Sequence, residues 1–288
     1  KRLAGPLSRL RRQLSQRESQ GLLGKSFFRI LGVQQVKIVQ DAFLRRTEEL
    51  DARLGVGRSF DMVGRSLTVG GRRARLWVVN GYADDAVLER AISGWLPIRD
   101  LNGIGTLEAF VAQYVTVSEA EAETDMDKAV TAVFSGKTLL VIDGYPGGVL
   151  MDAKQFPLRG IEEPDTSKVL RGSHDGFVES IMKNAALLRR RIRDPQLTLE
   201  GLKVGGRSHA DVALCYLADK ADPALLEELR GKLRHMQISS ISMSQESIAE
   251  AIAPAQWWNP FPKTRYTERP DVATASIMEV GGQAVLGR

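Results

Sequence analysis

The sequence of 288 residues is long enough for one or two domains, and its 43% hydrophobic and 26% charged residues are ordinary for a globular protein. A single cysteine, Cys215, excludes an internal disulfide and fits a reducing compartment. No apolar run approaches the roughly 18 residues that a membrane-spanning helix needs. Because Lys1 is not an initiator methionine and residues 283–286 resemble the start of a strand, we expect the sequence to be part of a longer chain.

The net charge of +5 is concentrated at the N-terminus. Residues 1–32 carry eight lysines and arginines and one acid, whereas the rest of the chain is close to neutral. We therefore interpret residues 1–34 as a basic arm. Such an arm can approach anionic lipid or nucleic acid, or it can be a solvated terminus. These alternatives stay open, although we do not expect nucleic acid as a partner.

The sequence pattern of residues 35–143 predicts a first α/β module. The apolar residues of 35–54 follow a helical period that ends at Gly55 and Gly57. The run at 138–142 is continuously apolar, as in a strand that is covered on both faces. The other predicted elements are strands at 66–69 and 74–80 around Gly70–Gly71, a helix from Asp84 or Asp85 to Ser93, a short helix, a strand near 114–117 and a helix at about 125–134.

Residues 197–288 repeat this order. The tetrapeptide VGGR occurs at 69–72 and again at 204–207, and each copy is followed by an apolar strand, an acidic helix cap and an amphipathic helix. The segment SGKTLLVI at 135–142 corresponds to GGQAVL at 281–286. The sequence thus predicts an α/β fold of two similar small modules that arose by tandem duplication.

A connector at 144–196 separates the two modules. Its first part is rich in glycine and proline, and its second part predicts a helix at 175–194, capped by Ser173 or Asp175 and ended by Asp194–Pro195. One apolar stripe runs along this helix, which we expect to pack across both modules. The stripe consists of Phe177, Ile181, Ala185, Leu188 and Ile192.

Motifs for nucleotide chemistry are incomplete. The Gly-Lys-Ser at 24–26 and the Gly-Lys-Thr at 136–138 both lack the first glycine of a phosphate-binding loop. The three histidines are far apart, no Cys or carboxylate cluster has metal-ligand spacing, and no G-x-S-x-G elbow is present. We therefore expect no catalytic, cofactor-binding or metal-binding residues, and no enzyme activity.

Three features nevertheless have both a functional and a structural interpretation. His174–Asp175 could act as an acid–base pair, but a helix start also favours a capping carboxylate. Cys215 lies in an apolar strand, which favours a core thiol over a nucleophile. Arg189, Arg190, Arg191 and Arg193 could bind phosphate groups or be solvated and ion-paired.

Residues 257–262, Trp-Trp-Asn-Pro-Phe-Pro, place three aromatic residues beside rigid prolines. This block predicts either a packed corner or a surface for a partner. Thr267 can cap the helix that follows, with Pro270 in its first turn.

Two long stretches resemble the signature segments of the GerA spore germination family. They are RGSHDGFVESIMKNAALLRRRIRDPQL at 171–197 and NPFPKTRYTERPDVATASIMEVG at 259–281, and LGVGRSFDM at 54–62 resembles the family less specifically. The Ser-His-Asp of the first stretch is closer to the stage V sporulation protein AF branch than to nutrient-receptor A subunits. The candidate connector and interface residues in these stretches are Arg171, His174, Asp175, Phe177, Glu179, Arg189, Arg190, Arg191, Tyr266, Glu268, Arg269 and Asp271.

The resemblance implies a region on the cytoplasmic (spore core) side of the spore inner membrane, followed by transmembrane helices. It also implies oligomeric complexes with other germination subunits, linked to ion release. It assigns no cofactor and no catalytic residue. The resulting hypothesis is a domain for assembly and signal transmission. Two alternatives stay open, a small-molecule-sensing domain of a receptor A subunit and an enzyme that uses the cleft between the modules.

Overall fold

The computed structural model describes residues 42–155, 175–206, 209–236, 248, 252, 264–279 and 283–286. The chain divides into two units, residues 1–48 and residues 49–288. Residues 42–54 are helical, which agrees with the described part of the helix predicted at 35–54. The basic arm and the aromatic block at 257–262 lie outside the described residues.

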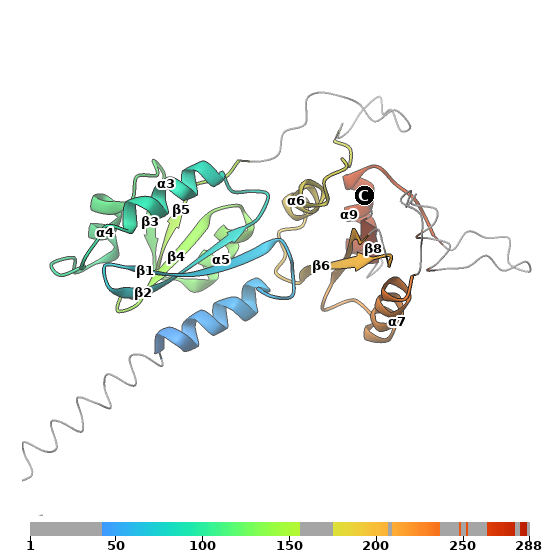
Figure 1. Cartoon of the computed structure of the whole chain (residues 1–288), viewed down its shortest axis with the longest axis horizontal. Coiled ribbons are helices and arrows are strands. Elements are labelled where there is room, and N and C mark those ends of the chain that lie inside the picture. The colour runs from blue at the N-terminus through green and yellow to red at the C-terminus, as the bar shows by residue number, and fades with distance from the viewer. Residues whose placement is uncertain are drawn as a thin grey trace, which may run out of the picture. The chain divides into compact units, whose positions relative to one another are not determined.

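Five antiparallel strands form the first sheet, in the spatial order β1-β2-β4-β5-β3 (Figure 1). Gly70 and Gly71, both with positive φ, make the two-residue turn between β1 and β2, as predicted. The strands are β1 Met62–Val69, β2 Arg72–Val79, β3 Ala120–Glu123, β4 Thr138–Ile142 and β5 Gly148–Met151.

Helices cover both faces of this sheet (Figure 1). On one face, Trp95 of α3 (Asp85–Trp95) and Phe110 of α4 (Leu107–Tyr114) pack against the strands. On the other face, α5 (Met126–Phe134) packs against β2 and β4. All five residues of β4 are buried, so the expectation of a strand covered on both faces is confirmed.

Two local predictions in this half are wrong. Residue 114 ends a helix, because Thr106 caps α4 and the helix places Phe110 and Tyr114 in contact, with ring centroids 5.6 Å apart. The strand follows later, as β3, whose alternating Ala and Glu side chains carry little strand signal. The chain after Gly144 also continues the sheet, because fully buried β5 pairs with both β4 and β3 inside the range predicted as connector.

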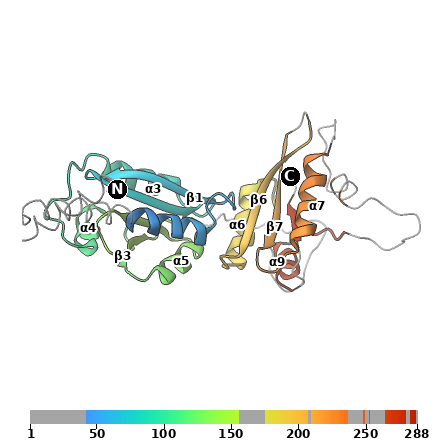
Figure 2. The same ribbon diagram turned by 90° about the horizontal axis from the view of Figure 1, so that it is seen from below.

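The second sheet has three antiparallel strands in the order β6-β7-β8. Helices α6 and α9 pack on one of its faces, while α7 packs on the other (Figure 2). Cys215 lies on β7 in the core beneath α6 and α9. The elements are α6 Ile181–Arg191, β6 Leu197–Val204, β7 Ala210–Leu217, α7 Pro223–Arg234, α9 Pro270–Glu279 and β8 Gln283–Leu286.

The connector helix is shorter than the predicted 175–194. Ser180, rather than Ser173 or Asp175, caps its N-terminus. The side chain of Asn184 accepts a hydrogen bond from the Val178 N–H and donates one to the Val178 carbonyl, which holds the preceding residues out of the helix. The apolar stripe still packs as one core cluster against β6, β7 and α9, and Phe177 joins it from the extended segment.

The two sheets share a pattern of connection. In each, a hairpin is followed by a helix, and a later helix leads into a strand that pairs with the second strand of the hairpin. They differ because the first sheet adds β3 and β5, and because the β6–β7 pairing ends at Val204 and Ala210, which have five residues between them in place of the two between β1 and β2. The fold is therefore mixed α/β with antiparallel sheets, and an origin by duplication stays a prediction.

Candidate functional site: a buried arginine–aspartate cluster

The loop at 55–61 leads from the first helix into β1. Gly55 and Gly57 have φ values of 77° and 82°, a left-handed conformation that strains residues with a Cβ. The N–H of Phe60 donates to the Leu199 carbonyl at 2.9 Å, which attaches the loop to β6. The sequence thus ends a helix with glycines and immediately ties the chain to a strand that lies far away in sequence.

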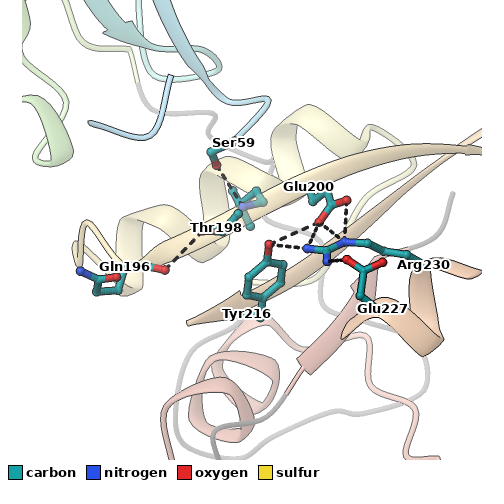
Figure 3. A network of polar contacts seen from close by, with 8 residues as sticks. Ser59, Gln196, Thr198, Glu200, Tyr216, Glu227 and Arg230 are labelled. Carbon is teal, nitrogen blue, oxygen red and sulfur yellow. Dashed lines mark hydrogen bonds and ion pairs between the residues drawn. The ribbon is translucent and has the colours of Figure 1, made fainter. Parts of the chain in front are cut away.

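A buried ion pair joins this loop to α6. Arg189 Nε donates to Asp61 Oδ2 at 2.9 Å, and Arg189 Nη2 donates to Asp61 Oδ1 at 3.2 Å. The two side chains are 1% and 0% exposed. Ser59 Oγ donates to Asp61 Oδ1 at 2.5 Å and accepts from the Leu199 N–H at 3.0 Å, and Figure 3 shows Ser59 beside β6. Ser59, Asp61 and Arg189 are called the Arg189 cluster below.

Other elements complete the surroundings of the guanidinium. Arg189 Nη2 also donates to the Leu197 carbonyl at 2.9 Å, and Nη1 donates to the Asp194 carbonyl at 3.3 Å. The guanidinium carbon lies 5.2 Å from the centre of the Phe134 ring of α5. A buried cation needs such partners, because moving an unpaired charge out of water costs several kcal/mol, of order 5.

This geometry couples separate parts of the chain. A bidentate guanidinium–carboxylate pair has a fixed orientation, so α6 and the 55–61 loop cannot shift independently without losing it. Pulling the ions apart would leave a buried charge without its partner. The cluster therefore behaves as a rigid connection among the loop, α6 and the start of β6.

Two titratable groups near the cluster, the Cys215 thiol and the Tyr82 hydroxyl, stay neutral at pH 7. Burial raises the pKa of the Cys215 thiol well above its usual range, and the nearby charge of Asp61 acts in the same direction. Burial also raises the pKa of the Tyr82 hydroxyl. At neutral pH neither group is a thiolate or phenolate nucleophile, which agrees with interpreting Cys215 as a core thiol.

The described ranges contain no arrangement of three or more His, Cys, Asp or Glu residues that could hold a metal ion. Two of the three histidines are described. His209 is exposed at the β6–β7 turn, and His235 ends α7, where Nδ1 lies 2.7 Å from the Gly231 carbonyl oxygen. Among the described residues, neither imidazole has a hydrogen bond to a Ser, Thr or Cys side chain that it could activate as a nucleophile.

A second polar cluster ties α7 to the other face of the second sheet (Figure 3). Arg230 donates to Glu200 through Nε at 3.0 Å and Nη2 at 2.9 Å, and to the Tyr216 hydroxyl at 3.1 Å. Burial, reinforced by the Glu200 charge, raises the pKa of Tyr216. Each charged group has a partner from another element, so the cluster is a structural clamp between α7 and the β6–β7 hairpin.

The residues predicted from the two signature stretches come together in part. The N–H of Phe177 donates to the Glu268 carbonyl at 2.8 Å, and helices α6 and α9 pack side by side. Arg191 Nη2 donates to Asp175 Oδ2 at 2.9 Å, so Asp175 pairs with the helix instead of capping it. The described parts of the two stretches therefore pack together on one face of the second sheet.

The other predicted residues have different surroundings. The hydrogen bond from Arg269 lowers the pKa of Asp271 in the first turn of α9. Tyr266 is 50% exposed, and Glu179 and Arg190 are also exposed. Arg171 and His174 lie outside the described residues.

Sequence reasoning missed Asp61 and Ser59, the partners of Arg189. Arg189 itself was expected to be solvated, ion-paired or phosphate-binding, and the ion-paired alternative is the one observed. The available signal was the 54–62 segment, which contains both missed residues and already resembled a known family. Nothing local in that segment indicates that an arginine about 130 residues away would meet it.

Fold and site together define a mixed α/β domain with two antiparallel sheets and a buried charge cluster that connects distant segments. Among the described residues, no helix has both the length and the apolar character needed to cross a membrane. The model of the Bacillus/Clostridium GerA spore germination protein family matches residues 48–286. The chain belongs to this GerA family.

Relatives of known name agree with this assignment. The chain is 36% identical over 236 residues to stage V sporulation protein AF of Bacillus subtilis (strain 168), an alignment that covers 82% of this chain and 48% of the relative. It is 26% identical to spore germination protein KA of the same organism, covering 78% of this chain and 42% of the relative. The chain thus spans about half the length of these curated relatives.

A solved structure has the same fold. The crystal structure of the N-terminal domain of the A subunit of the Bacillus megaterium spore germinant receptor GerK3 matches with a TM-score of 0.62 and 26% identity. The match covers 84% of this chain and 89% of that chain. Another relative, 33% identical over 57% of this chain and 32% of its own length, is the uncharacterized membrane protein YfkQ of Bacillus subtilis (strain 168).

Proposed function

We propose that this chain is the N-terminal region of a spore inner-membrane germination protein, and that it serves assembly and signal transmission in an oligomeric complex linked to ion release. The domain faces the spore core, and transmembrane helices in the rest of the protein anchor it. Its function is closest to that of the stage V sporulation protein AF branch. The 36% identity with that protein supports this choice of branch.

The observation that carries the proposal is the Arg189 cluster. Transmission of a signal requires an element that responds as a unit when one part of it is moved. Asp61 lies before β1 and Arg189 lies on α6, and their bidentate contact is fully buried. A displacement of α6 is therefore passed directly to the loop that begins the first sheet.

We further propose that the domain has no chemical step of its own. Burial keeps Cys215 and Tyr82 neutral, and His209 and His235 lie apart on a turn and at a helix end. Purified chain should show no turnover in broad hydrolase and nucleotidase screens. Reproducible turnover that survives repurification would replace this proposal by the enzyme alternative.

A second candidate function is small-molecule sensing, favoured by the likeness to a domain of a germinant receptor A subunit. A ligand that binds the folded state raises the melting temperature, by an amount that grows with its concentration. Screening of nutrient amino acids, sugars and nucleosides by thermal shift distinguishes the two functions. A saturable rise for one compound supports sensing, whereas no rise supports assembly and transmission.

The decisive experiment uses spores whose full-length protein carries Asp61→Asn, compared with Asp211→Asn as a matched control. Asp211 forms an exposed ion pair with Lys203 at 3.9 Å, so the control removes the same charge without touching a buried contact. We expect slower ion release during germination with Asp61→Asn and normal release with Asp211→Asn, at equal protein levels in the membrane. Normal release in both would contradict the transmission role.

A further inference from the structure

The strand β1 forms an edge of the first sheet. It pairs only with β2, through all eight of its residues. Among residues 42–155 and the other described ranges, no main-chain group of 63–68 forms a hydrogen bond outside this pair. A row of unpaired N–H and C=O groups is a template on which another strand can pair.

Two other sheet edges are protected by contrast. β3 has only four residues, and its Glu121 forms an ion pair with Lys137 at 2.6 Å. The edge of β6 is covered by the 55–61 loop, because the Phe60 N–H donates to the Leu199 carbonyl and the Leu199 N–H donates to Ser59 Oγ. Short length, charge and a covering loop are means by which proteins protect their edges. β1 is twice as long as β3, and no loop in the described part of the chain covers it.

A groove of about 500 Å³ lies beside this open edge, between β1 and α3. Val63 of β1 is 38% exposed in it, and Leu96 at the end of α3 is 69% exposed. Ile92 also lines the groove, but it packs partly against the core of the first sheet, and Trp95 belongs to that core. The exposed apolar side chains of the groove are therefore Val63 and Leu96, one on each wall.

The open edge and the groove suit the same kind of ligand. Val63 and Arg65 are two residues apart, so both side chains point to the α3 face of the sheet, and their β2 partners Val78 and Leu76 line the groove with them. A strand added along β1 continues this alternation and places every second side chain on the α3 face. Main-chain pairing then supplies affinity, while the groove selects the alternate side chains.

The charges of the groove indicate which segment fits. Arg65 lies on the strand wall, while Asp85 and Glu89 lie on the helix wall, and none of the three has an ion-pair partner in the described ranges. β1 itself contains no acidic residue, so a second copy of β1 has nothing to place opposite Arg65. The complementary ligand is an extended segment of a different chain, apolar at alternate positions, with an acidic residue for Arg65 and a basic residue for Asp85 and Glu89.

We propose that β1 pairs with an extended segment of another protein, whose alternate side chains enter the β1–α3 groove. The segment adds a sixth strand to the first sheet. Because Asp61 of the Arg189 cluster directly precedes β1, a partner at this edge acts on the strand whose start that cluster holds. The inference names a partner contact for the proposed assembly function and rests on it.

The probe for this contact is the fluorescein-labelled peptide Val-Thr-Glu-Thr-Val-Thr-Lys-amide. As a strand, it places its valines, glutamate and lysine on one face. We expect saturable binding to the 288-residue chain by fluorescence anisotropy, and slower hydrogen exchange of the amides of 63–68 in the complex. Two N-methylated forms of the peptide, each lacking the N–H groups along one edge, should differ. One form should bind like the parent and the other should lose binding, because only one edge of the peptide faces β1.

Substitutions on the two walls locate the contact. Arg65→Glu and Leu96→Gln should each raise the peptide Kd at least about tenfold, because the first opposes the glutamate and the second removes an apolar contact. The matched controls are Arg90→Glu, at an exposed position of α3 outside the groove, and Leu225→Gln, at a 42% exposed position of α7. Both controls should bind the peptide like the wild type.

Several results would overturn the inference: no saturable binding, equal binding of the two N-methylated forms, or equal effects of the groove variants and their controls. Protection of 63–68 that rises with chain concentration in the absence of peptide would assign this edge to a second copy and would also overturn it. If the peptide binds but Arg65→Glu spores germinate normally, the inference stands and its use in assembly fails. If Asp61→Asn slows ion release while the peptide does not bind, the proposed function stands and the inference fails.

Discussion

Removing the charge of Asp61 should strongly destabilise the domain. The carboxylate accepts hydrogen bonds from Arg189 Nε, Arg189 Nη2 and Ser59 Oγ in a site without solvent access. In the Asp61→Asn variant, the Arg189 guanidinium keeps its hydrogen bonds to the Leu197 and Asp194 carbonyls but loses its counter-ion. Breaking a buried ion pair by removing one partner costs about 3–5 kcal/mol, a large part of the roughly 5–15 kcal/mol by which domains are stable.

The assay is urea unfolding followed by circular dichroism, with the free energy extrapolated to water. Asp211→Asn is again the control, because its exposed pair with Lys203, at 62% and 73% side-chain exposure, should contribute no more than about 0.5 kcal/mol. A loss below about 1 kcal/mol for Asp61→Asn, or a loss equal to that of the control, would refute the reasoning. It would mean that the guanidinium finds water or another partner once the carboxylate is gone.

Three further predictions concern the second sheet. Leu188→Ala should lower the free energy of unfolding, measured by urea titration, by about 2–5 kcal/mol. Phe177 is half-buried, so Phe177→Ala should cost about the lower end of that range. Losses below about 0.5 kcal/mol for both variants would mean that neither side chain belongs to the core. The Cys215 thiol should react with thiol reagents only as fast as the chain unfolds, and rapid labelling of the folded chain would contradict its burial. Asp271→Asn should lower stability by at most about 1 kcal/mol at pH 7, because Arg269 and the start of α9 favour the carboxylate. The pKa of Asp271 is lower in the folded chain than in the unfolded chain, where it is about 3.9. The stability difference between wild type and Asp271→Asn should therefore be lost as the pH falls from about 3.9 through the folded pKa. A difference that persisted at still lower pH would have another cause.

Local patterns predicted most of the elements correctly. The Gly70–Gly71 turn and the acidic cap Asp84 depend on a few neighbouring residues, and both lie where they were expected. The apolar stripe of the connector helix is buried as expected, but it packs on the second sheet and Phe177 precedes the helix. The strand at 120–123 was missed because its Ala-Glu alternation has low strand propensity and is stabilised by pairing with β5. Tertiary pairing there overrides a weak local preference.

Only one of the three residues of the Arg189 cluster, Arg189 itself, was predicted from the sequence. Arg189 attracted attention because it lies in a basic run, but the identity of its partner depends on how the chain brings residues 59–61 to α6. The sequence separation of two residues in a buried ion pair follows no fixed rule. The tertiary fold, and not the number of residues between them, brings the two ions together. The 54–62 segment was noted for a weaker family resemblance, but neither Ser59 nor Asp61 was among the predicted interface residues.

Breaking the Arg189–Asp61 pair on one side should be destabilising, but replacing both ions by apolar residues should alter the geometry of the domain more than its stability, and one paired substitution tests this. Apolar residues of similar volume can replace a buried ion pair at little loss, or even with a gain of about 1–4 kcal/mol, because no charge has to leave water. Asp61→Leu with Arg189→Met should therefore unfold near the wild-type urea concentration, although each single change is destabilising. The apolar pair lacks the bidentate orientation that fixes α6 to the 55–61 loop, so we expect spores with this stable double variant to release ions more slowly. Normal release would show that close packing at this position is sufficient and that the charges do not transmit the signal.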